Sequence, residues 1–359
     1  YPPVASGRFL FSGELSVTSL ATGKLDENRI TKGSCSRYVG VVPANGLLYT
    51  FAKGCTCWPM LKGFAALAPA GGEGSAARPD RPEDFPLQTG PAQAPAEHAK
   101  ADPAQEWPMY RHDPWRSGST TGEGPAALGV VWRQKVPGAA GRRGKEWRDN
   151  PFVPGRLTAP VVAAGVAVVA SPDRHQVTAM DAATGEIKWQ FTANGRVDTP
   201  PTIVDGRCLF GTRTGWVYCL RLADGKRLWR LRAAAGDRQI VAHGQVESPW
   251  PVAGSVLAIG PTVYFAAGRQ YLADGGIRVF AVEAATGKVR WVRRIDSLPD
   301  HHYYGAAALE FDNYDLLVRE GTHVSMSRWR LDAATGEMNV LPRSGFGHYR
   351  TGGGGVMAP

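Results

Sequence analysis

The chain has 359 residues, of which 43% are hydrophobic and 20% are charged, and it contains 44 Gly and 27 Pro. Its 11 Trp, 11 Tyr and 12 Phe can bury a large core, which excludes disorder along the whole length. No run of about 18 apolar residues occurs, so we expect no transmembrane helix. The high glycine and proline content is typical of proteins with many tight turns.

The formal net charge is +9, which on its own favours an acidic partner such as nucleic acid. The basic residues, however, are spread along the chain and often alternate with apolar ones, as they do between Lys226 and Arg232. On a β-strand this alternation places the charges on one solvated face. We therefore expect no nucleic acid partner.

Three regions follow one another along the chain. Residues 1–69 are β-rich, and residues 107–359 form a second, longer β-rich region. Between them, residues 70–106 are rich in Ala, Pro and Gly and poor in large apolar residues, which indicates a linker or surface excursion. The chain starts at Tyr1 and ends in a glycine-rich stretch without a closing strand, so we expect a fragment of a longer protein.

The second β-rich region contains a repeated unit, an alternating apolar strand followed by a tight turn and a second strand. The turn glycines are 40, 62 and 49 residues apart, which is close to the period of propeller blades. A weaker copy lies at 17–25. The residues that define the repeat are Asp181, Gly185 and Trp189, then Asp224, Gly225 and Trp229, then Gly287 and Trp291, and finally Asp332 and Gly336.

The first copy shows the physical logic of the unit. The carboxylate of Asp181 is placed to accept hydrogen bonds from backbone N–H groups just ahead of it, and Gly185 supplies the positive φ of the turn. A large, flat Trp189 can pack against the neighbouring sheet. Each small sheet cannot bury its own faces, and radial stacking of sheets solves this problem. Further hairpins complete each unit, so we predict an all-β protein, a β-propeller of four-stranded blades.

The unit from Ala179 to Trp189 resembles the tryptophan-docking repeat of PQQ-like, quinoprotein-type β-propellers, and the resemblance covers about 157–340. Two copies depart from the pattern, because Glu283 replaces the Asp and the second turn is read as shortened at Ala223-Asp224-Gly225. The chain is similar to quinoprotein alcohol dehydrogenases and to the propeller lipoprotein of the outer-membrane β-barrel assembly machinery. The resemblance implies seven to eight blades in the complete protein.

A more extensive resemblance is to uncharacterised bacterial PQQ-like repeat proteins common in planctomycetes. It rests on the stretches 107–118, 196–202 and 215–220, and on 43–49 with the Cys55-Thr56-Cys57 that follows. Members of that family are longer at both ends, which agrees with a fragment. The resemblance implies a fold rather than an activity.

The resemblance to quinoprotein dehydrogenases implies PQQ beneath a disulfide of adjacent cysteines, with Ca²⁺ held by Glu and Asn beside a catalytic Asp. This chain has no adjacent cysteine pair, because Thr56 separates Cys55 from Cys57, and no calcium motif aligns. We therefore predict no cofactor and no catalytic residue, with PQQ and calcium as the alternative.

The five cysteines leave several possibilities open. Counted outward from the turn at Arg213-Thr214, Cys208 and Cys219 are directly opposed across a hairpin, either as a disulfide or, as we favour, as two buried thiols. Among Cys35, Cys55 and Cys57 one disulfide is expected in an oxidising compartment, and a metal site is the alternative. The resemblance also implies a further Cys upstream, which this chain lacks.

These observations favour a non-catalytic binding or scaffold propeller, monomeric and located in the periplasm or cell envelope. We expect a protein or small ligand to bind at a loop-rich face or in the central channel. The alternatives are a PQQ-dependent oxidoreductase and a Cys-ligated metal or redox protein.

Overall fold

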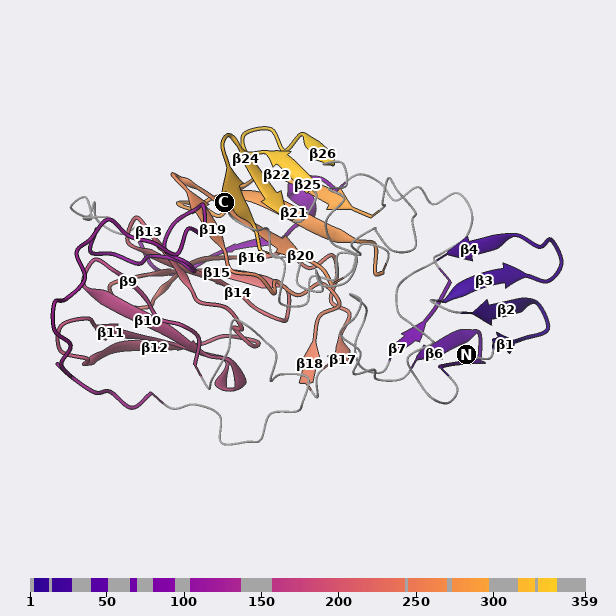
Figure 1. The fold of residues 1–359 in the computed structure, drawn as a ribbon, viewed down its shortest axis with the longest axis horizontal. Coiled ribbons are helices and arrows are strands. Elements are labelled where there is room, and N and C mark those ends of the chain that lie inside the picture. The colour runs from indigo at the N-terminus through magenta and orange to yellow at the C-terminus, as the bar shows by residue number, and fades with distance from the viewer. Residues whose placement is uncertain are drawn as a thin grey trace.

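The computed structural model describes residues 3–12, 15–27, 40–50, 65–69, 80–93, 104–136, 157–242, 245–269, 273–296, 316–326 and 329–340. Within them the chain forms antiparallel strands and short turns of 3₁₀-helix, η2 (Pro82–Asp84) and η4 (Pro172–Arg174), and it has no α-helix. None of these helical turns has the length and hydropathy needed to span a membrane. The all-β prediction is therefore confirmed (Figure 1).

Four consecutive antiparallel sheets form the blades of a β-propeller, each in the order of the chain. Blade A consists of β9 (Val161–Ala163), β10 (Val166–Ser171), β11 (Gln176–Asp181) and β12 (Ile187–Thr192). Blade B consists of β13 (Thr202–Val204), β14 (Arg207–Gly211), β15 (Trp216–Arg221) and β16 (Arg227–Arg232). Blade C consists of β19 (Leu257–Ile259), β20 (Thr262–Ala267), β21 (Ile277–Glu283) and β22 (Val289–Ile295). Blade D consists of β23 (Val318–Glu320), β24 (His323–Met326), β25 (Trp329–Asp332) and β26 (Met338–Val340).

The N-terminal region adds two further sheets, which Figure 1 draws apart from the four blades. The first has four strands, β1 (Val4–Ala5), β2 (Phe9–Ser12), β3 (Ser16–Ser19) and β4 (Leu25–Glu27). The second has three, β5 (Val41–Ala44), β6 (Leu47–Thr50) and β7 (Ala65–Leu67). The weak repeat at 17–25 forms the same kind of turn as the others, with the Gly23 N–H donating to the Ser19 carbonyl at 2.8 Å.

The repeated turn is held as its sequence predicts in the first and fourth copies. Asp181 Oδ1 accepts from the N–H groups of Ala183 and Thr184, both at 3.0 Å. Asp332 Oδ1 accepts in the same way from Ala334 and Thr335. These hydrogen bonds favour the ionised carboxylate and lower the pKa of Asp181 and of Asp332.

The second copy corrects the prediction of a shortened turn. Its turn has the same length as the others, because the Gly225 N–H donates to Arg221 O at 2.8 Å, as the Gly185 N–H does to Asp181 O. Arg221 therefore occupies the position of Asp181, and Asp224 occupies that of Thr184. An ion pair between Arg221 Nη2 and Asp224 Oδ2, at 2.5 Å, replaces the usual hydrogen bonds of the turn. Chiefly through its hydrogen bond to Arg221, the pKa of Asp224 falls to about 2.

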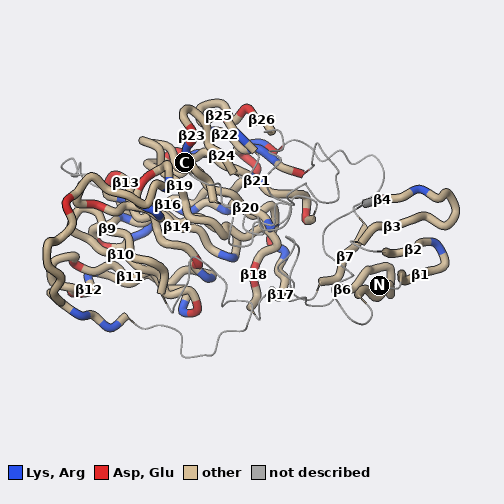
Figure 2. Tube along the Cα trace, in the orientation of Figure 1, with Lys and Arg blue, Asp and Glu red and all other residues tan. Residues whose placement is uncertain are grey.

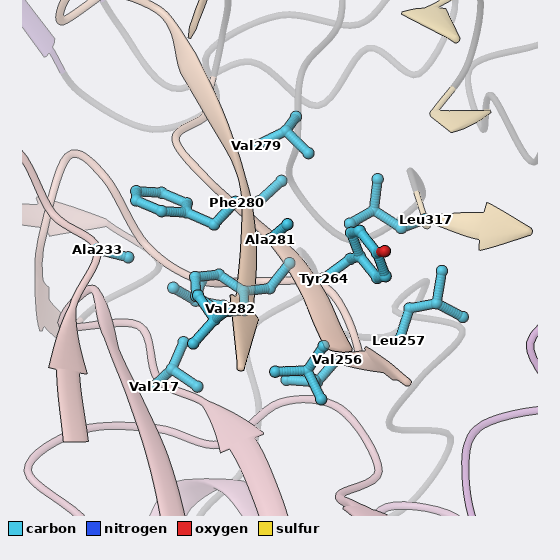
Figure 3. Close-up of a cluster of buried hydrophobic side chains, with 14 of the residues drawn as sticks. Val217, Ala233, Val256, Leu257, Tyr264, Val279, Phe280, Ala281, Val282 and Leu317 are labelled. Atoms are coloured by element: carbon cyan, nitrogen blue, oxygen red, sulfur yellow. The ribbon is translucent and has the colours of Figure 1, made fainter. Parts of the chain in front are cut away.

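The core lies between the blades. One buried cluster joins the facing sides of blades A and B, with Val168, Val177, Phe210 and Leu220 among its members. The other joins blades B, C and D (Figure 3). In that view Val217 and Ala233 of blade B lie beside Val282 and Phe280 of blade C. Successive side chains along each strand point to opposite faces of the sheet, so each face packs against one neighbouring blade.

The predicted linker at 70–106 is not merely a connection. Within it, β8 (Leu87–Thr89) pairs with β16 and gives blade B a fifth strand. Phe85 is buried and packs edge-on against Phe280, with ring centroids 4.7 Å apart. Asp80 binds Arg294 at 2.6 Å and Arg278 at 3.0 Å. The composition of this region did not predict the anchoring, because the side chains that anchor it are only one phenylalanine and one carboxylate.

Neighbouring blades are joined by tryptophans that dock on turn glycines. A Cβ atom added to Gly225 would lie 2.6 Å from the ring of Trp189, which shows how closely the indole covers that glycine. The indole N–H of Trp189 also donates to the Leu222 carbonyl at 2.7 Å. Burying one tryptophan contributes roughly 4–6 kcal/mol at the usual area coefficient. Each docking therefore joins two blades by packing and a hydrogen bond.

A pair of glycine substitutions separates this docking from simple backbone strain. Gly225 and Gly165 both have φ of +71°, but a Cβ on Gly165 would meet nothing within 4 Å. We expect Gly165→Ala to destabilise the chain by about 1–2 kcal/mol, because a side chain at positive φ is strained. We expect Gly225→Ala to cost about 1–3 kcal/mol more, because it also displaces Trp189. Urea denaturation measures both, and equal losses would contradict the docking role.

Candidate functional site

Five charged side chains are buried where loops of blades A and B meet the segment that leads into blade C. We call them the charge cluster: Arg196, Asp198, Arg213, Glu247 and Arg269. None is more than 4% exposed. Buried charges of this kind are costly unless they are paired, so their pairing defines what the site can do. Elsewhere Lys and Arg are interspersed with Asp and Glu along the chain, without separating into a basic and an acidic region (Figure 2).

Asp198 is the centre of the charge cluster. Its Oδ1 accepts from Arg196 Nη2 at 2.7 Å, and its Oδ2 accepts from Arg213 Nε at 2.6 Å. Backbone hydrogen bonds join the same loops. The Arg213 N–H donates to Arg196 O, and the Ser248 N–H donates to Arg213 O. The carboxylate therefore ties the segment after β12 to the β14–β15 turn, and the Ser248 backbone hydrogen bond adds the segment after β18.

Glu247 and Arg269 form the second ion pair, with Glu247 Oε1 and Arg269 Nη1 3.2 Å apart. Glu247 ends β18 (Gln245–Glu247), which pairs with β17 (Ile240–Ala242) as a two-stranded hairpin. Arg269 follows β20 of blade C. The ion pair therefore fixes the base of the hairpin to blade C.

His175 lies beside the charge cluster in the β10–β11 turn. Burial lowers its pKa, and the positive charge of Arg196 lowers it further, whereas Gln245, Asp198 and Asp173 act in the opposite direction. The imidazole is therefore neutral at pH 7. Burial likewise lowers the pKa of Arg196, and Asp198 opposes that effect.

A second feature, which we call the crossing segment (residues 106–118), runs across the first strands of the blades. It exchanges backbone hydrogen bonds between Trp107 and Val162 of β9, and the Ile203 N–H of β13 donates to Pro108 O. At its other end the Arg319 N–H of β23 donates to Pro114 O at 2.8 Å. This segment therefore joins the first strands of blades A, B and D.

Arg116 anchors the crossing segment. Its buried guanidinium donates to the carbonyl oxygens of Tyr110, Ser255, Val256 and Leu317, at distances from 2.8 to 3.4 Å. Burial lowers the pKa of Arg116 to about 10, so it remains charged at neutral pH. One side chain thus connects the crossing segment to the starts of blades C and D.

The described cysteines differ from the prediction in one respect. Cys208 pairs with Leu220, and Cys219 pairs with Leu209, so the two are not directly opposed. The turn is centred on Thr214 rather than between Arg213 and Thr214, and this half-residue difference sends the two thiols to opposite faces of blade B. Both are free and buried, and burial raises the pKa of each thiol. The other candidates, Cys35, Cys55 and Cys57, lie outside the described residues.

The repeat residues are brought together across blade boundaries rather than within a catalytic site. Trp229 docks on Gly287 and Trp291 docks on Gly336, with indole N–H donation at 3.0 and 3.1 Å to Ala284 and Ala333. In the described parts of the chain, no three His, Cys, Asp or Glu side chains gather as a metal site.

One docking tryptophan was missed by the sequence analysis. Trp132 covers Gly185, where an added Cβ would lie 2.5 Å from its ring, and its indole N–H donates to Ala182 O at 3.0 Å. The stretch Val130-Val131-Trp132 resembles Ile187-Lys188-Trp189, which was the available signal. No Gly lies four residues before Trp132, where the repeat has its Thr-Gly turn, so the pattern of the other copies does not include it. The charge cluster was also missed, because its members lie outside the repeated turn motif and far apart in sequence.

Comparison with known proteins identifies the class to which this architecture belongs. The family model described as outer membrane protein assembly factor BamB, of the PQQ-like repeat type, matches residues 126–302 and 213–338. These matches together extend over more than half of the chain, which therefore belongs to this family of PQQ-like repeat propellers.

Two curated relatives are similar over part of the chain. Outer membrane protein assembly factor BamB from Moranella endobia (strain PCIT) is 26% identical over 142 residues, which are 40% of this chain and 32% of the relative. A polyvinylalcohol dehydrogenase from Pseudomonas sp is 28% identical over 123 residues, which are 34% of this chain and 17% of the relative. The alignments thus span at most about a third of these relatives.

Solved structures of the same type are also similar to this chain. The quinohemoprotein alcohol dehydrogenase from Comamonas testosteroni is 16% identical, with a TM-score of 0.43 over 67% of this chain and 41% of that one.

The charge cluster generates a stability prediction. We expect Asp198→Asn to destabilise the chain by about 3–5 kcal/mol, because it leaves two buried guanidinium groups without their carboxylate. The matched control is Asp224→Asn, which removes a carboxylate from the partly exposed ion pair with Arg221 and should cost below about 1 kcal/mol. Thermal and urea denaturation compare the two variants. A loss at Asp198 as small as that at Asp224 would show that the cluster does not hold these loops together.

Proposed function

We propose that this chain is a non-catalytic propeller of the cell envelope that binds a protein partner at the hairpin β17–β18. The observation that carries the proposal is an exposed apolar pair on that hairpin. Val241 and Val246 face each other across the two strands and are 67% and 60% exposed. Figure 1 shows the hairpin extending away from the blades.

The anchoring of the hairpin supports a binding role. Glu247 at its base is 1% exposed and is paired with Arg269, so the hairpin is held at one end while its valines remain in water. A two-stranded hairpin has unpaired backbone groups along both edges, and such edges are used to add a strand from another protein. We infer that the partner presents an extended segment with apolar side chains. That a relative is named an assembly factor agrees with this proposal.

The described residues do not fit PQQ and calcium, the cofactors of the alternative function. Cys208 and Cys219 are eleven positions apart in sequence and lie on opposite faces of one sheet, so they cannot supply a disulfide between adjacent residues. The crossing segment also bonds to the first strands of blades A, B and D. These observations support a role without a redox cofactor, although the similarity to a polyvinylalcohol dehydrogenase favours the alternative.

A cofactor titration tests the non-catalytic part of the proposal. We expect the visible spectrum of PQQ to remain unchanged when the purified chain and Ca²⁺ are added. We also expect no PQQ-dependent dye reduction with primary alcohols or sugars. A quinoprotein alcohol dehydrogenase in the same buffer serves as the positive control. Saturable binding together with dye reduction would overturn this part.

Site-specific photo-crosslinking tests the partner site. With a photoreactive residue in place of Val241, we expect a covalent adduct with one partner protein, identified by mass spectrometry, in the cells that make the chain. The matched control is the same residue at Ile187, another exposed aliphatic position, which lies on blade A. Adducts of equal yield at both positions, or none at Val241, would contradict a partner site on the hairpin.

A further inference from the structure

The described structure contains an extended segment that has no sheet. Residues 128–136 form no backbone-to-backbone hydrogen bond with any described residue. Three of its aliphatic side chains face water, with Leu128 92%, Val130 76% and Val131 86% exposed. An extended segment with unpaired backbone groups and exposed apolar side chains is a typical unpaired strand edge.

The docking of Trp132 identifies the position of this segment in the propeller. Trp189, Trp229 and Trp291 are each the third residue of the last strand of a blade, and each docks on the turn glycine of the next blade. Trp132 docks on Gly185 of blade A in the same manner. By this equivalence, residues 130–135 occupy the place of the outer strand in a blade that precedes blade A.

The sheet β5–β7 lacks the fourth strand that each blade has. It contains three strands in chain order, and β7 pairs only with β6. Its first hairpin matches the first hairpin of blade A. The turn residues Asn45 and Gly46 have φ of 51° and 72°, and Ala164 and Gly165 have 49° and 71°. β5, β6 and β7 therefore correspond to the first, second and third strands of a blade.

The sequence after β7 continues the same repeat. Ala66 and Leu67 precede Gly72 by the spacing at which Ala179 and Met180 precede Gly185. In each blade a last strand follows that glycine. Here the sequence instead enters the Pro- and Ala-rich region, and the next stretch of the last-strand type is 130–135.

We propose that residues 130–135 form the outer strand of the blade whose other three strands are β5, β6 and β7. The sheet β5–β7, which Figure 1 draws on the opposite side from blade A, would close onto the exposed edge of residues 130–135. This closure would cover Val130 and Val131 and would pair the backbone of residues 130–135 with that of β7. It places the blades consecutively along the chain, with β8 and the crossing segment as an insertion between a third and a fourth strand.

The register of the closure follows from the described blades. Gln190 pairs with Thr178 in blade A, and Arg230 pairs with Tyr218 in blade B, in each case one residue after the docking tryptophan. The equivalent pair in the proposed blade is Arg133 with Ala65. Their Cβ atoms would then lie on one face, about 4.5–5.5 Å apart.

Disulfide formation between introduced cysteines tests this register in the full chain. We expect the variant carrying Ala65→Cys and Arg133→Cys to form an intramolecular disulfide under mild oxidation. Peptide mass mapping distinguishes it from any bond that involves the native cysteines. The matched control combines Ala65→Cys with Leu128→Cys, which is about 16 Å further along the strand and should not cross-link. Circular dichroism verifies that both variants fold.

The outcomes separate the possible occupants of the edge. A monomeric 65–133 disulfide with none at 65–128 supports the closure. A 65–133 disulfide found only between two chains would show that a second copy occupies the edge, and it would overturn the proposal. Equal cross-linking at both positions, or none at either, would also overturn it. If the variants do not fold, hydrogen exchange of the native chain decides, since residues 130–135 should then be protected like β12.

Discussion

The contact on which the propeller depends is an indole ring lying flat on a turn glycine of the next blade, with its N–H donating to a carbonyl in the same turn. Trp189 on Gly225 is the clearest case, and three further tryptophans repeat it. A four-stranded sheet has two faces and cannot bury both alone. This contact sets the distance and direction from each blade to the next, and the apolar clusters on both faces of blade B follow from it.

The charge cluster and the crossing segment stabilise the parts of the propeller that the docking tryptophans do not join. Tryptophans join the outer strands, whereas Arg116 connects the starts of blades C and D, and Asp198 joins the loop after blade A to the β14–β15 turn of blade B. The buried charges are paired with one another rather than directed at a metal or a nucleophile, as far as the described residues extend. The Glu247–Arg269 ion pair holds the base of the hairpin β17–β18 while Val241 and Val246 stay exposed, which is why we place the partner there.

The turn of the second repeat shows how one architecture tolerates different chemistry. In blade A a carboxylate accepts from two backbone N–H groups, and in blade B an arginine takes its place and binds Asp224. Both arrangements hold the same backbone, because the hydrogen bond from the glycine N–H to the carbonyl four residues earlier is retained. The glycine and the docking tryptophan are therefore more constrained than the polar residue that braces the turn.

The sequence by itself determined the fold class, the repeat, and the role of Asp181, Gly185 and Trp189, because these depend on strand alternation and on a turn formed by neighbouring residues. Only the tertiary structure decided the rest. The register that separates Cys208 from Cys219 depends on a turn shifted by half a residue. The burial of Phe85, the docking of Trp132 and the pairing of Glu247 with Arg269 join segments distant in sequence. Contacts between such segments leave no periodic signal along the chain, since their spacing is set by how the blades stack.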